Sequence, residues 1–188
     1  MDQFEKERNE KLAHIVIKGL KSRNMTGYYA KDREEALKKA LDLIPEGSSV
    51  AMGGCMSAQE IGLTDVLGNC RYTFYDRGFM AKREGLLKAY GADVFVSSVN
   101  AMTDDGILVN IDGNANRVSF IAQGPQKVVF IVGMNKVTSD LDAAMKRARN
   151  IAAPINAGRF DITTPCTKTG KCMDCKSIDT VCCQFLIT

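Results

Sequence analysis

Histidine is almost absent from this sequence, because His14 is the only one among 188 residues. It lies beside the apolar stripe of a charged N-terminal segment, where a single histidine is usually solvated or packed. Catalytic arrangements that pair serine or cysteine with histidine are therefore excluded. A Gly-x-Gly-x-x-Gly fingerprint is also missing, as are the lysine and Ser/Thr that complete a P-loop, so a nucleotide-binding function has little support.

Long apolar runs and an excess of one charge are missing as well. No stretch approaches the length of a membrane span. The first residues, MDQFEKERNEK, lack the apolar core of a signal peptide. The 25 basic and 22 acidic residues are spread along the chain, without a basic run interleaved with aromatic residues. We therefore expect a cytoplasmic protein that binds neither a membrane nor a nucleic acid.

Helix and strand patterns alternate along most of the chain. The apolar spacing predicts helices over residues 3–22, from Asp32 to Ile44, from Ser57, over 80–90, and from Thr138 or Ser139 onwards. Short apolar or alternating runs predict strands at 28–29, 48–52, 71–75, 94–99, 107–111 and 127–132. Alternation of this kind is typical of an α/β fold, in which helices cover both faces of a mostly parallel sheet.

Local signals refine this α/β prediction. Asp32 with Glu35, and Ser57 with Glu60, have the spacing of capping boxes, and Gly91 is expected to close the 80–90 helix in a left-handed conformation. The strands 94–99 and 107–111 are too close for a crossover helix, which predicts one antiparallel hairpin. The run KVVFIV at 127–132 is apolar on both faces, as in the middle of a parallel sheet.

The sequence contains no internal repeat or linker before residue 158. We therefore expect one α/β domain over residues 1–158, followed by a cysteine-rich tail over 159–188 that packs on it. Residues 1–157 are expected to hold a complete core without the tail.

Polar and flexible residues follow several expected strands, and ligands of open α/β sheets bind at the carboxyl ends of strands. The candidate ligand-binding residues are Gly53, Gly54, Ser57, Asn100, Asn114, Arg117 and Asn135, with Asp112 and Lys136 as candidate catalytic residues. A Gly-Gly turn into a helix can direct backbone N–H groups at an anion, although for the glycines alone a tight turn with an ordinary cap is the favoured explanation. Lys136 could hold a carboxylate or phosphate and Asp112 could move a proton, whereas the structural alternative is an ion pair among these charges.

Five of the seven cysteines lie close together near the C-terminus, with the spacing C-x5-C-x2-C-x6-C-C. The Cys172–Cys175 unit lets two thiolates from one turn meet one metal. The expected ligands are Cys166, Cys172, Cys175 and either Cys182 or Cys183, of which we select Cys182. Zinc and an iron–sulfur cluster both fit such ligands, and nearby lysines would favour the thiolate forms. Free thiols packed in the apolar VCCQF segment are the alternative.

The segment ADVFVSSVNAMTDDGILVNIDGNANRVSFIAQGPQKVVFIVGMNK, residues 92–136, resembles the LUD-domain family, formerly described as a domain of unknown function. The segment SSVAMGGCMSAQEIGL and the PC…TGKCMDC tail are similar to the same subgroup. The resemblance implies the fold of the sugar-phosphate isomerase and CoA-transferase-like superfamily. Some members of the family belong to an iron–sulfur-dependent system that oxidises L-lactate to pyruvate.

Two functions follow from these observations. In the first, the protein is an accessory subunit or enzyme of lactate or organic-acid utilisation that binds a small anionic metabolite, with iron–sulfur oxidoreductase subunits as partners. In the second, it is a metal-binding or redox-sensing module whose α/β body serves only as a scaffold. Whether the chain catalyses a reaction, and whether it forms a homo-oligomer, both stay open at this point.

Overall fold

The computed structural model describes residues 2–188 and divides them into two compact units. Unit 1 comprises the chain up to Gly27 together with residues 99–118 and 134–188, and unit 2 comprises residues 28–98 and 119–133. Helices and strands alternate in both units, so the α/β fold class is confirmed. No helix within residues 2–188 combines the length and the apolar character that crossing a membrane requires.

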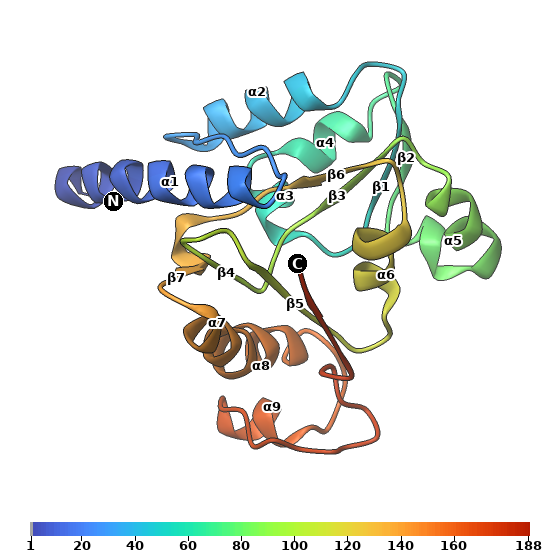
Figure 1. Cartoon of the computed structure of the whole chain (residues 1–188). Helices are drawn as coiled ribbons and strands as arrows, with labels where there is room; N and C mark the ends of the chain where they lie inside the picture. The colour runs from blue at the N-terminus through green and yellow to red at the C-terminus, as the bar shows by residue number, and fades with distance from the viewer. Residues whose placement is uncertain (1) are drawn as a thin grey trace. The chain divides into compact units, whose positions relative to one another are not determined.

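Unit 2 is built on the parallel sheet A, whose strand order is β2-β1-β3-β6. Its strands are β1 (Ser49–Met52), β2 (Thr73–Tyr75), β3 (Val94–Ser97) and β6 (Lys127–Phe130) (Figure 1). All four residues of β3 are buried, as are Val50 to Met52 of β1, because these two central strands are covered on both faces.

Two apolar clusters cover the two faces of sheet A. The helical elements of unit 2 are α2 (Arg33–Leu43), α3 (Met56–Glu60), α4 (Leu63–Leu67), η1 (Phe79–Ala81), α5 (Arg83–Tyr90) and the part of α6 (Asn116–Gln123) from residue 119. On one face Val50 and Val96 pack with Ile44 and with residues of α3 and α4. On the other face Phe95 packs with Phe120 of α6. Strand side chains alternate between the two clusters, as the two-residue period of a strand requires.

Unit 1 is built on the mixed sheet B, whose strand order is β7-β4-β5-β8. Its strands are β4 (Ala101–Thr103), β5 (Leu108–Asp112), β7 (Val137–Thr138) and β8 (Gln184–Ile187). Strand β5 pairs antiparallel with both β4 and β8, whereas β4 and β7 are parallel. The tail predicted over residues 159–188 thus supplies an edge strand of this sheet, and the predicted boundary at residue 158 stays a prediction.

One helix of unit 1 precedes these strands in the sequence, and the others lie between β5 and β8. They are α1 (Gln3–Ser22), η2 (Met134–Lys136), α7 (Leu141–Arg147), the π-helical turn η3 (Ala148–Ala152), α8 (Ala153–Ala157) and α9 (Pro165–Thr169). Val109 and Ile111 of β5 pack against Ala144 and Ala148 on the α7–η3 helix. Helix α1 approaches the 104–106 turn so closely at Gly19 that a Cβ there would lie 2.4 Å from the backbone carbon of Asp105.

Three expected helix boundaries need correction. Helix α3 begins at Met56 with Cys55 as its N-cap, so Ser57 lies inside the helix and does not cap it. Gly91 has a φ of −87°, so it ends α5 without the left-handed conformation, and its N–H donates to the carbonyl of Lys88 at 3.0 Å. Asp140 caps α7 in place of Thr138 or Ser139, since its carboxylate accepts the N–H of Ala143 at 2.8 Å.

Three expected strands need correction as well. Residues 28–29 are not a strand, and the exposed Tyr28 ring instead faces the ammonium of Lys39 at 5.1 Å. The expected hairpin exists, but its first strand is β4, while residues 94–97 form β3 of sheet A. Strand β6 lies at an edge of sheet A and not in its middle, because it pairs with β3 alone.

Candidate functional site

The carboxyl edge of sheet A is the first candidate site. Strand β1 pairs with β2 on one side and with β3 on the other, so the chain leaves β1 at a topological switch point. In open parallel sheets, such points are where ligands bind, because the two connections separate there and leave a crevice. Gly53 and Gly54 directly follow β1 at this edge.

The two glycines leave space at the switch point. A Cβ built on either Gly53 or Gly54 would meet no atom within 4 Å, and neither residue has a positive φ. Helix α3, which follows, has five residues, and its N-cap makes no side-chain hydrogen bond. Ser57 is half-buried and is the second residue of this helix. The backbone at Gly53–Gly54 can therefore be approached by a ligand, with little help from the dipole of so short a helix.

Two residues that we did not predict share this edge. Strands β1 and β2 are parallel, and the exposed Arg77 comes two residues after the end of β2, at the same edge of the sheet. Ser97 ends β3 and is 1% exposed, with its hydroxyl donating to the carbonyl of Ser98 at 3.2 Å. The signal available in the sequence for Arg77 was a charge shortly after the predicted 71–75 strand.

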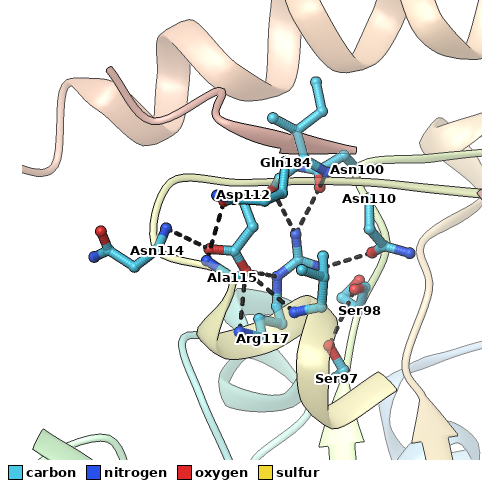
Figure 2. A network of polar contacts seen from close by, with 11 residues as sticks. Ser97, Ser98, Asn100, Asn110, Asp112, Asn114, Ala115, Arg117 and Gln184 are labelled. Carbon is cyan, nitrogen blue, oxygen red and sulfur yellow. Dashed lines mark hydrogen bonds and ion pairs between the residues drawn. The ribbon is translucent and has the colours of Figure 1, made fainter. Parts of the chain in front are cut away.

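A polar network around Asp112 and Arg117 is the second candidate site, and it lies in unit 1 (Figure 2). The carboxylate of Asp112 at the end of β5 accepts the backbone N–H groups of Asn114 and Arg117, each at 3.0 Å, and of Val118 at 3.3 Å. The Nε atom of Arg117 is 4.0 Å from the same carboxylate. Asp112 thus holds the chain between β5 and α6 in place.

The guanidinium of Arg117 also bonds to other groups of this network. It donates to Asn110 Oδ1 at 2.5 Å, to Asn100 Oδ1 at 2.8 Å and to the carbonyl of Ile111 at 2.8 Å. Both charged side chains are largely buried, with 16% of Arg117 and 8% of Asp112 exposed. The two buried charges are therefore compensated by each other and by the neighbouring amide and carbonyl groups. This arrangement agrees with the structural alternative given above, an ion pair among these charges.

The remaining predicted residues divide between the units. Gly53, Gly54 and Ser57 belong to unit 2, whereas Asn100, Asp112, Asn114, Arg117, Asn135 and Lys136 belong to unit 1. Arg147 links two of the latter, donating to the carbonyls of Asn135, at 3.0 Å, and of Asn100. Lys136 is half-buried at the end of η2, and Asn114 is exposed. Catalytic roles for Asp112 and Lys136 stay predictions.

A pocket in unit 1 brings four of the tail cysteines together. Its wall includes Cys166, Cys172, Cys175 and Cys182, together with Arg149 of the π-helical turn η3. Cys183 is exposed, and its Sγ faces the carbonyl of Thr180 at 3.5 Å. All seven cysteines are free thiols. Within residues 2–188, no three His, Cys, Asp or Glu side chains are gathered as closely as the ligands of one metal ion.

The pocket gives its thiols different acidities. Burial raises the pKa of the Cys182 thiol to about 11, and the negative charges of Cys172, Cys166 and Cys175 act in the same direction. The backbone N–H of Ser177, followed by its hydroxyl, lowers the pKa of the Cys175 thiol. Cys182 therefore favours its protonated form, while Cys175 is the more readily ionised of the two.

This difference predicts the order in which the two thiols react in protein treated with a chelator and a reductant. At about pH 8, iodoacetamide should modify Cys175 faster than Cys182, because the thiolate is the reacting form. Peptide mass spectrometry over a time course measures both rates in one sample. Equal rates, or faster modification of Cys182, would contradict the described environment of these thiols.

Comparison with known proteins gives one finding. A family model described as the LUD domain matches residues 13–188, nearly the whole chain and all of the cysteine-rich tail. No curated protein matches the sequence.

Proposed function

Because the chain belongs to the LUD-domain family, we propose that it serves lactate or related organic-acid utilisation by binding a small anionic metabolite at the carboxyl edge of sheet A. The observation that carries this proposal is the open switch point after β1, where Gly53 and Gly54 leave room beside bare backbone. In this proposal the chain is an accessory subunit or enzyme that works beside iron–sulfur oxidoreductase subunits in the cytoplasm.

The chemistry of this edge suits a carboxylate or a phosphate. Backbone N–H groups of a glycine turn can donate to an anion at close range, since no side chain keeps the ligand away. Arg77 supplies a positive charge with a planar set of donors, which matches the geometry of carboxylate and phosphate oxygens. The half-buried Ser98 directly follows β3 and borders the other side of the switch point.

Thermal unfolding with pyruvate, L-lactate, inorganic phosphate and acetyl-CoA tests the proposal. A ligand that binds only the native protein adds about 2.7 kcal/mol of stability at one hundred times its dissociation constant. For a chain of this size we expect an increase in Tm of roughly 5–10 °C with at least one of these compounds. No increase with any of them would refute metabolite binding.

Valine at Gly54 should abolish this ligand-induced increase, because its side chain would fill the space beside the backbone. The substitution should leave the fold intact, since a Cβ at Gly54 meets no atom within 4 Å. Gly91→Val is the matched control, at an exposed glycine of the same unit that precedes β3 and so lies at the opposite edge of the sheet. A Gly54→Val protein that responds to the ligand like the control would show that the loop is only a turn.

A further inference from the structure

We propose that Cys166, Cys172, Cys175 and Cys182 bind a thiophilic metal centre as four thiolates. The four side chains line one pocket of unit 1, although they come from positions up to 16 residues apart in the sequence. This inference goes beyond the proposed metabolite site, which lies in unit 2, and each can fail without the other. Four cysteine sulfurs are the ligand set of structural zinc sites and of iron–sulfur clusters.

Local structure places each of these thiols. Cys166 lies in the first turn of α9, which Gly170 ends in the left-handed conformation at a φ of 67°. Cys172 and Cys175 flank a turn in which Asp174 has a φ of 49°, a left-handed conformation that aspartate adopts more readily than most residues with a Cβ. Cys182 precedes β8 and packs against the apolar cluster of sheet B. The left-handed residue at Asp174 makes the chain turn sharply between the two pocket cysteines.

An ion pair secures this turn and adds a positive charge to the pocket. The guanidinium of Arg149 bonds to the carboxylate of Asp174 and lies 6.0 Å from the centre of the Phe185 ring. Arg149 comes from a single π-helical turn inserted between α7 and α8. Such insertions interrupt the regular helix at some cost and occur frequently at functional sites. Four thiolates with a divalent ion carry two negative charges, and Arg149 can offset one of them.

Hydrogen-bond donors also accompany the thiols. Thr164 Oγ1 lies 3.3 Å from Cys166 Sγ, and the hydroxyl of this buried threonine can donate to a thiolate. Donors of this kind orient metal ligands and tune the bound metal. The alternative is four packed thiols without a ligand. It accounts for Cys182 in its apolar surroundings, but it does not explain why the charged Arg149 lines the same pocket as the four thiols.

Two metal centres share this ligand chemistry and differ in size. Tetrahedral zinc, with Zn–S distances of about 2.3 Å, would draw the four sulfurs to about 3.8 Å from one another. The thiols are arranged around the pocket wall and are not gathered at one point, so zinc would require them to move inwards. A cluster binds its cysteines through different irons and holds the sulfurs farther apart. In both cases each thiol releases a proton on binding.

The metal content of anaerobically purified full-length protein tests the site. We expect one centre per chain, seen either as zinc or as iron with acid-labile sulfide, and the ratio of these elements identifies the metal. Cys172→Ser with Cys175→Ser should lower the metal content at least tenfold. The matched control is Cys70→Ser with Cys183→Ser, two exposed cysteines that do not line the pocket, and it should keep the content of the unchanged protein. Equal losses in both pairs would overturn the proposal.

A second measurement does not depend on how the variants fold. The unchanged metal-free protein is titrated with Co²⁺, and in separate samples with Zn²⁺ or with ferrous iron and sulfide. A four-thiolate site should give the visible absorption of tetrahedral cobalt thiolate or the absorption of a cluster. Arg149→Gln should weaken Co²⁺ binding about 10–100-fold, and Arg149→Lys should restore much of this loss by returning the charge. Absence of bound metal in all these samples would overturn the four-thiolate site.

Discussion

Replacing Asp112 by alanine should lower the free energy of unfolding by about 3–5 kcal/mol, the usual effect of removing one partner of a buried ion pair. The substitution would leave the guanidinium of Arg117 in its largely buried position without the only carboxylate of the network. It would also remove the acceptor of three backbone N–H groups where β5 passes into α6. Urea denaturation followed by far-ultraviolet circular dichroism measures the change.

Asp142→Ala is the matched control for this prediction. Asp142 also pairs with a cation, Lys146 at 2.5 Å, but 76% of the Asp142 side chain is exposed. Exposed pairs of this kind contribute at most about 1 kcal/mol, so the control should unfold close to the unchanged protein. If the Asp112→Ala protein is as stable as the control, the structural role of the carboxylate is minor and the network does not depend on it. A large loss of stability would instead support the network as a structural element.

The alternation of helices and strands was sufficient to predict the fold class, because it depends on residues close in the sequence. Asp32 caps α2 as expected, since its carboxylate accepts the N–H of Glu35 only three residues away. The two-sheet arrangement was not predicted. Strand β7 has two residues and β4 has three, too few for a visible period, and β8 pairs with a strand more than 70 residues earlier. Such long-range pairing leaves no local signal.

In the candidate sites, too, residues close in the sequence could be predicted to lie together, whereas partners from distant elements could not. The spacing of Cys172 and Cys175 already places two thiols on one turn, and the pocket adds Cys166 and Cys182 to them. Arg149 was missed because it lies on a helix 17 residues before Cys166, outside any recognisable motif. Asp112 and Arg117 were considered as a pair, but their backbone and amide partners depend on how β5 and α6 meet. Sequence spacing carries none of that geometry.

Strand β8 gives the tail a larger structural role than the sequence predicted, because it pairs with β5 of sheet B. Residues 1–157 were expected to hold a complete core, yet β8 forms an edge of sheet B and pairs with β5 from Val109 to Asp112. Leu108 and Thr188 extend this pairing by exchanging both backbone hydrogen bonds, at 2.9 and 3.1 Å. Without β8, strand β5 would become an edge, with unpaired backbone groups and exposed apolar side chains.

Deleting residues 184–188 should therefore destabilise unit 1 by several kcal/mol, at roughly 1 kcal/mol for each lost hydrogen bond between β5 and β8. The expected result in hydrogen exchange is fast exchange for the 108–112 segment, while β1 and β3 of unit 2 keep their protection, since neither pairs with β8. Phe185→Ser is the control, because it removes a partly exposed side chain and keeps the backbone of β8. The prediction fails if the 108–112 segment stays as protected in the truncated chain as in this control, because sheet B would then be stable without its C-terminal strand.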